Sequence, residues 1–130
     1  MAILIDTSVL VDLERVEALA AAPEEERAFI SAMTASELLH GVERAQDEAR
    51  RVRRLAFVER VLDTVPVLAF DLDVARVHAR IWSGLLRRGG MIGAHDLVIA
   101  ATALAHDLSL MTRNRREFER VEGLALHPVG

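Results

Sequence analysis

The sequence predicts an α/β fold in which helices flank a central, mostly parallel sheet. Two observations support this prediction. The first apolar run, Ile3-Leu4-Ile5, places three bulky aliphatic residues in succession, which is typical of a strand buried on both faces. Further short apolar runs alternate with longer segments in which apolar residues recur at helical spacing. Strands separated by helices form βαβ units with right-handed crossovers, so the strands are expected to run parallel.

The apolar runs define five expected strands, over residues 2–5, 28–31, 65–70, 108–112 and 124–126. Pro66 indicates that the third begins there or lies at an irregular edge. Asp6, Thr7 or Ser8 can cap a first helix. Later helices are expected from 34 to 44, from 46 to 62, from Asp71 or Asp73 to about 88, and from 94 to 106, with short turns at 23–26 and 113–120. A chain of 130 residues fits one domain, residues 1–130.

Composition excludes several classes of protein. Hydrophobic residues make up 52% of the chain and charged residues 28%, so we expect a folded, globular protein. No apolar run approaches the ~20 residues that span a bilayer, and no basic signal-peptide region is visible; no membrane association and a cytoplasmic location are expected. The chain has no cysteine, which excludes disulfides, zinc–thiolate sites and a cysteine nucleophile.

Four polar residues, far apart in sequence, are predicted to meet at one edge of the sheet. Asp6 and Asn114 follow strands, and Glu37 lies in the first turn of the helix that leaves the second strand. The helix that begins near Asp96 must run antiparallel to the strand it precedes, so its N-terminus also points to the carboxyl edge. Ligands of open α/β sheets bind outside this edge.

Three carboxylates brought together repel one another and raise one another's pKa values. A divalent cation relieves that repulsion, and oxygen ligands favour Mg²⁺ or Mn²⁺. A metal held in this way can activate water for attack on a phosphodiester. The sequence contains no nucleophile elbow and no P-loop, so metal-assisted phosphodiester hydrolysis fits the residues best.

Each of these residues also has a purely structural interpretation. Asp6 can cap a helix, and Thr34-x-x-Glu37 matches a capping box. Asp96 suits the first turn of a helix, and Asn114 suits a turn. Two histidines, His40 and His95, stand beside these acids but lack the spacing of a zinc site, and we interpret them as local hydrogen-bonding groups.

Four motifs in order resemble the PIN-domain family, and specifically the VapC-type toxins of toxin–antitoxin pairs. They are residues 5–8 (IDTS), 34–41 (TASELLHG), 92–101 (IGAHDLVIAA) and 112–118 (TRNRREF). The resemblance implies a three-layer domain with strand order 3-2-1-4-5. It also implies an endoribonuclease that depends on Mg²⁺ or Mn²⁺ and is inhibited by a cognate antitoxin.

The resemblance assigns roles to particular residues. Asp6 and Asp96 resemble the acids that hold the metal, and Glu37 resembles the third acid, which binds metal or orients water. Asn114 stands where many relatives have a fourth acid, so it can hydrogen bond to water but carries no charge. Ser8 and Thr112 are expected to support the site through hydrogen bonds.

The expected partners follow from the same resemblance. The substrate is a structured RNA such as tRNA or rRNA. Five arginines close to the Asp96 and Asn114 loops are expected to meet its phosphates: Arg87, Arg88, Arg113, Arg115 and Arg116. A VapB-type antitoxin is expected to lay a helix along an apolar groove and to place an arginine among the acids, and promoter DNA is contacted only through it. An apolar helix face with Phe57, Val58 and Val61 suggests a homodimer.

Two other functions compete with the nuclease. The formal net charge of −4 argues weakly against nucleic acid binding. Together with Asn114, it favours a weakly active PIN scaffold that works mainly as a binding module in an antitoxin–promoter complex. A phosphatase or receiver domain using Asp6 would need a lysine near the same edge, and the chain has none.

Overall fold

The computed structural model describes residues 2–11 and 13–129. It contains a five-stranded parallel sheet in the order β3-β2-β1-β4-β5, which confirms the predicted strand order. The strands are β1 (Ile3–Ile5), β2 (Ala28–Ser31), β3 (Val67–Leu68), β4 (Ser109–Met111) and β5 (Leu126–His127).

Strand β1 lies at the centre of the sheet and is buried on both faces. Leu4, with Leu110 of β4, packs into the core on one side, whereas Ile3 and Ile5 pack into the core on the other. All three β1 side chains are at most 3% exposed. The continuous apolar run is therefore explained by burial on two sides, as expected for a parallel sheet.

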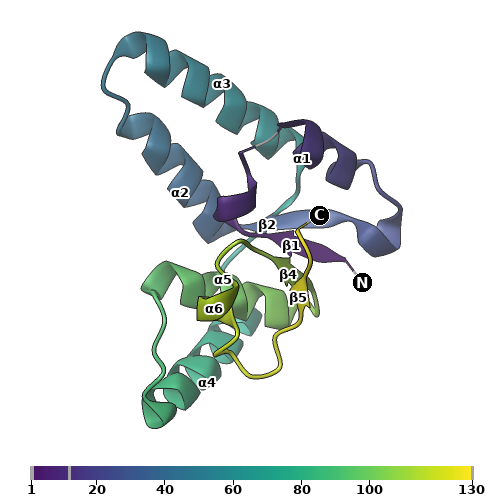
Figure 1. The fold of residues 1–130 in the computed structure, drawn as a ribbon, viewed down its shortest axis with the longest axis vertical. Coiled ribbons are helices and arrows are strands. Elements are labelled where there is room, and N and C mark those ends of the chain that lie inside the picture. The colour runs from purple at the N-terminus through teal and green to yellow at the C-terminus, as the bar shows by residue number, and fades with distance from the viewer. Residues whose placement is uncertain (1, 12, 130) are drawn as a thin grey trace.

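Helices cover both faces of the sheet and produce three layers (Figure 1). On one side lie α1, α2 and α3, and on the other lie α4, α5 and α6. Their bounds are α1 (Leu13–Ala20), α2 (Ala32–Glu43), α3 (Glu48–Thr64), α4 (Leu72–Arg88), α5 (Ala94–Ala105) and α6 (Arg115–Phe118), with single 3₁₀ turns η1 (Thr7–Val9) and η2 (Glu24–Glu26). Within the described ranges, no helix is long and apolar enough to cross a membrane.

The helix caps differ partly from the sequence prediction. Asp71 caps α4 by accepting a hydrogen bond from the Val74 amide at 3.0 Å, and Gly89 ends the same helix in the left-handed region with φ of 66°, as its two glycines indicate. The segment after β1 is a 3₁₀ turn rather than the start of a longer helix, and the Asp6 side chain makes no capping hydrogen bond to it. The Asp6 carboxylate is thereby available for other contacts.

The alternative interpretation of Thr34 and Glu37 as a capping box is wrong. Helix α2 starts two residues earlier, where the Ser31 hydroxyl accepts a hydrogen bond from the Thr34 amide at 3.0 Å. Thr34 is therefore a buried residue inside the first turn. With Ser31 as the cap, the Glu37 side chain has no capping role and is directed to the carboxyl edge of the sheet.

Two further predictions change. Strand β3 is shorter than expected, because Pro66 has no amide hydrogen for the sheet and serves only as an acceptor, from the Ile30 amide at 3.0 Å.

The proposed apolar dimer face is also wrong, since Val58 and Val61 are at most 3% exposed. Val61 packs in the core around β1 and α1.

Candidate active site

The Asp6 carboxylate is the most firmly held acid of the site. It is 2% exposed, and its Oδ2 accepts hydrogen bonds from the hydroxyls of Ser8 and Thr112, each at 2.7 Å. Both donors act on the same oxygen. No donor from residues 2–11 or 13–129 reaches Oδ1, which leaves that atom for a ligand.

Ser8 and Thr112 are themselves fixed by the backbone that follows β4. The Ser8 hydroxyl accepts a hydrogen bond from the Arg113 amide at 3.0 Å, and the Thr112 hydroxyl accepts one from the Asn114 amide at 2.9 Å. These contacts tie the loop after β1 to the loop after β4. The supporting roles expected for Ser8 and Thr112 agree with this geometry.

Glu37 extends from α2 to the same edge. Its Oε1 accepts a hydrogen bond from the Thr7 hydroxyl at 2.6 Å, and its Oε2 lies 3.4 Å from Nδ1 of His95. The side chain of Glu37 is 29% exposed. Neither contact was predicted from the sequence, because both depend on the position of α2 relative to η1 and α5.

Asp96 lies in the first turn of α5 and is half-buried. Because α5 immediately precedes the parallel strand β4, its N-terminus lies at the carboxyl edge. Burial is the main reason why the pKa of the Asp96 carboxyl rises from 3.8 to about 6. The negative charges of Asp6, Glu117 and Glu37, in order of decreasing effect, raise this pKa further, whereas His95 lowers it. The predicted convergence of three acids is therefore found in the fold.

Glu117 is a fourth acid near this cluster. It lies on α6 and is half-buried, and its charge acts on the pKa of Asp96 more strongly than that of Glu37. The sequence pattern favours a surface charge for Glu117, with a supporting role at the rim of the site as the alternative, because the residue lies three positions after Asn114 in a charged stretch. The proximity of Glu117 to Asp96 depends on how α6 and the start of α5 are placed in the folded chain.

Asn114 follows β4 at the carboxyl edge of the sheet. Its backbone amide is part of the site through Thr112, but its side chain is exposed and, in the described part of the chain, makes no hydrogen bond to an acid. Asn114 occupies the N-cap position of α6 without a side-chain capping bond. The side-chain amide of Asn114 is therefore available to contact a bound molecule.

A cavity of about 580 Å³ opens beside the acids, between α2 and the start of α5. Its lining combines an acid with groups that can contact phosphate or sugar: Ser36, Glu37, His40, Gly41, Arg44 and His95. The arginines expected to contact RNA are exposed: Arg87, Arg88, Arg113, Arg115 and Arg116. Of these, Arg113 lies next to the acids because its amide binds Ser8.

The fold and the site define an α/β protein with an acidic centre at the carboxyl edge of a parallel sheet of order 3-2-1-4-5. The family model of the PIN domain matches residues 3–124. Across 99% of this chain, 38% of residues are identical to a relative named Ribonuclease VapC1 from Rickettsia felis, 97% of which is covered. The chain therefore belongs to the PIN-domain family and, within it, to the VapC group.

Other relatives and solved structures agree with this assignment. The tRNA(fMet)-specific endonuclease VapC of Shigella flexneri is 38% identical, over 73% of this chain and 70% of its own length. The crystal structure of DNA-bound VapBC from Salmonella typhimurium contains a chain that superposes with a TM-score of 0.84 at 29% identity, covering 98% of this chain and 97% of that one. VapBC-5 from Mycobacterium tuberculosis has a TM-score of 0.75 at 33% identity, covering 95% and 93%.

Proposed function

We propose that this protein is a metal-dependent endoribonuclease, the toxin of a toxin–antitoxin pair, that cleaves structured RNA such as tRNA or rRNA. The observation that carries the proposal is the convergence of Asp6, Glu37 and Asp96 at one sheet edge, with the pKa of Asp96 raised to about 6. Relatives named ribonuclease VapC and tRNA(fMet)-specific endonuclease VapC support the choice of RNA as substrate.

The residues at the site fit a Mg²⁺ or Mn²⁺ ion. The acids offer carboxylate oxygens, the type of ligand these ions prefer, and within residues 2–11 and 13–129 no donor contacts Oδ1 of Asp6. Among the described residues, no three His, Asp or Glu side chains are arranged to hold a metal by themselves. This agrees with Mg²⁺, which commonly takes one or two carboxylates and completes its shell with water and substrate. We assign Asp6 and Asp96 as its ligands.

The residues of the chain then divide the work of hydrolysis. When bound, the ion neutralises the carboxylates and stabilises charge on the phosphate. Ser8 and Thr112 keep the Asp6 carboxylate in one orientation. Thr7 holds Oε1 of Glu37, so Oε2 is the atom that accepts the proton of the attacking water. The water oxygen forms the new bond to phosphorus, the bond to the leaving ribose oxygen breaks, and solvent returns a proton to that oxygen.

We further propose a VapB-type antitoxin as the partner. A cavity of about 410 Å³ between α2 and α3 has Glu37 in its lining and presents the partly exposed apolar side chains of Leu38 and Phe57. An antitoxin helix along this groove would bring an arginine to the acids, replacing the positive charge of the metal. Promoter DNA is contacted through the antitoxin rather than by this acidic chain, and the pair acts in the cytoplasm.

The test is cleavage of total RNA by purified protein with Mg²⁺, Mn²⁺ or EDTA, with cut ends mapped. We expect a few discrete cuts that require metal and are lost in Asp6→Asn, while the matched control Asp63→Asn, which changes an exposed acid of α3, retains them. Cutting by Asp6→Asn at the wild-type rate would contradict the mechanism. No cutting by folded wild type under any metal would favour the binding-module alternative instead.

A further inference from the structure

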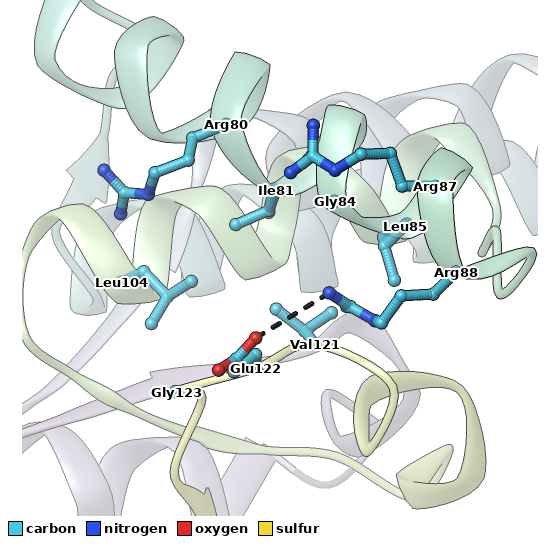
Figure 2. A pocket seen from close by; sticks show the side chains of 10 residues that line it. All are labelled: Arg80, Ile81, Gly84, Leu85, Arg87, Arg88, Leu104, Val121, Glu122 and Gly123. Carbon is cyan, nitrogen blue, oxygen red and sulfur yellow. Dashed lines mark ion pairs between the residues drawn. The ribbon is translucent and has the colours of Figure 1, made fainter.

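We propose that an arginine-lined pocket on α4 binds the RNA strand beyond the cleavage site, holding a phosphate of a flanking nucleotide. This inference rests on the proposed ribonuclease function and extends it to a second contact with the same substrate. The pocket has a volume of about 300 Å³ and lies between α4, the end of α5 and residues 121–123 (Figure 2). None of its lining residues belongs to the acidic site.

Three guanidinium groups are directed to this pocket. Arg80, Arg87 and Arg88 follow one another at helical spacing on the face of α4 that also bears Ile81 and Leu85. Figure 2 shows Arg88 extending across the pocket to Glu122, and Arg80 at the far end. Planar guanidinium groups bind phosphate in a bidentate manner, so three of them around one cavity suit an anion with several oxygens.

The positive charge of the pocket is mostly uncompensated. Neither Arg80 nor Arg87 has a carboxylate partner among the residues that the structure describes. Arg88 is 3.7 Å from Glu122, and this pair is well exposed on both sides, at 47% and 89%, so it is weak. The pocket carries a net charge of about +2 on a protein whose total is −4, and such local charge is what an acidic protein needs in order to hold RNA.

Gly84 gives independent support. It is buried in the interior of α4, where glycine costs roughly 1 kcal/mol relative to alanine, and it has no left-handed backbone to justify it. A Cβ at this position would lie 3.2 Å from the Arg88 guanidinium and 4.0 Å from that of Arg87. The missing side chain thus makes room for two guanidinium groups to close over the helix.

Contacts join the pocket to the loop that leads to Asp96. Arg88 donates a hydrogen bond to the carbonyl of Arg120 at 3.1 Å, and Arg120 donates one to the carbonyl of Met91 at 3.0 Å. Helix α6, which precedes Arg120 and the pocket residues 121–123 along the chain, bears the exposed residues Arg115 and Arg116; Arg115 is 4.0 Å from Glu119. The pocket is thus joined, by direct contacts and by sequence, to segments of the acidic site. This connection favours a strand of the RNA substrate over an acidic peptide as the occupant.

The first test is affinity for a fluorescent single-stranded RNA of about twenty nucleotides, measured by anisotropy in EDTA so that no cleavage occurs. We expect the double variant Arg80→Gln/Arg87→Gln to bind about tenfold more weakly and to lower the slope of log K against log salt by about 1.4, at ~0.7 for each lost phosphate contact. The control Arg51→Gln removes an arginine from α3, on the opposite side of the sheet (Figure 1), and should bind as wild type does.

Two further variants separate a specific pocket from general charge or misfolding. Gly84→Leu keeps every charge, fills the pocket and strengthens the helix, so we expect RNA affinity to fall as in the double variant. Glu122→Gln releases Arg88, so we expect affinity to rise about threefold, at the lower end of what one exposed charge contributes. A gain of this kind does not arise from a damaged fold.

The outcomes distinguish this inference from the proposed function. If the double variant and Gly84→Leu bind RNA as tightly as Arg51→Gln, or if the wild type binds no RNA, the pocket is not an RNA site. If these variants lose affinity for the antitoxin but keep affinity for RNA, the occupant is an acidic peptide and the inference is wrong. Failure of metal-dependent cleavage, measured separately, contradicts the nuclease and leaves the binding result to stand by itself.

Discussion

The ionisation of Asp96 connects the acidic site to stability. Its pKa rises from 3.8 to about 6 on folding, mainly through burial and then through the charges of Asp6, Glu117 and Glu37. A raised pKa means that the folded state binds the proton more tightly than the unfolded state. Stability from this group is complete below about pH 4 and is lost as the pH rises through about 6.

Asp96→Asn should therefore stabilise the metal-free protein at about pH 8. The asparagine has no charge to repel its neighbours, and we expect a gain of about 1 kcal/mol, reduced from the full linkage value because the side chain is half exposed. The gain should mostly disappear at about pH 4.5. Thermal unfolding in EDTA at both pH values measures it, with Asp63→Asn as the control; equal gains at both pH values would rule out this origin.

Bound Mg²⁺ should make the wild type more stable than Asp96→Asn, the reverse of their order in EDTA. Because Mg²⁺ binds only the folded site, it should raise the melting temperature of the wild type in a concentration-dependent manner. Asp96→Asn lacks a charged ligand, so the same titration should give little or no shift. Differential scanning calorimetry with and without Mg²⁺ measures both shifts, and an equal rise in wild type and variant would place the ion elsewhere.

Thr112 is the residue whose loss should disturb Asp6 most. Thr112→Val keeps the shape but removes the donor to Asp6 Oδ2 and the acceptor for the Asn114 amide. We expect a 10–100-fold loss of RNA cleavage and a loss of about 1–3 kcal/mol in unfolding free energy. Thr112→Ser should recover most of both. Cleavage rates and urea denaturation provide the measurements, and full activity in Thr112→Val would remove this residue from the supporting set.

At the scale of elements, the helix caps decide where side chains are directed. Ser31 caps α2 with its hydroxyl, which is fully buried. Ser31→Ala should lower the unfolding free energy by about 1–2 kcal/mol, whereas Glu37→Gln should change it little because Glu37 caps nothing. Urea denaturation of both variants distinguishes this arrangement from a capping box. A larger loss in Glu37→Gln than in Ser31→Ala would contradict it.

The sequence was sufficient for the order of elements and for the convergence of the acids. Both follow from general rules. A strand buried on both faces has a continuous apolar sequence, as Ile3-Leu4-Ile5 has. The alternation of parallel strands and helices then determines which helix ends lie at the carboxyl edge. The proximity of Asp6 and Asp96 could therefore be predicted from the sequence alone. Glu37 was ambiguous, because one spacing satisfied both a cap and a site.

Other features depend on contacts that the sequence does not encode locally. The position of Glu117 near Asp96 requires the packing of α6, and the burial of Val61 requires the packing of α3 against α1. The pocket around Gly84 likewise becomes visible only when the segment 121–123 closes over α4. In each case the sequence pattern gives a face or a spacing, whereas tertiary packing decides whether that face is covered.

At the scale of the whole molecule, an exposed apolar stripe on α4 supports the proposal of a homodimer. Leu72, Trp82 and Leu86 are 49–65% exposed, and they repeat with Ala75 and Ala79 at alternating spacings of three and four residues, as in a helix–helix seam. Large residues toward the ends and small ones between them allow two copies to interlock. The stripe lies on a different face of α4 from the arginine pocket.

We expect the wild type to be a dimer and Leu86→Glu to be a monomer at micromolar concentration. A buried charge facing its own copy across a symmetric interface is strongly unfavourable. Val52→Glu is the matched control, because Val52 is 54% exposed on α3 and lies outside the stripe. Size-exclusion chromatography with light scattering measures the mass of each; a monomeric wild type would rule out the homodimer.

The hydrogen bonds of Asp6 have a consequence for protein synthesis. Ser8 is made among the first residues, whereas Thr112 and the amides of Arg113 and Asn114 are made much later, after all three acids Asp6, Glu37 and Asp96. Until β4 pairs with β1, the Asp6 carboxylate lacks one of its two hydroxyl donors, and strand β1 is paired on one side only. A nascent chain that has not yet reached position 112 therefore carries Asp6, Glu37 and Asp96 but lacks contacts that orient the Asp6 carboxylate. We expect the site to stay unordered until residues 112–114 have been made and β4 has paired with β1.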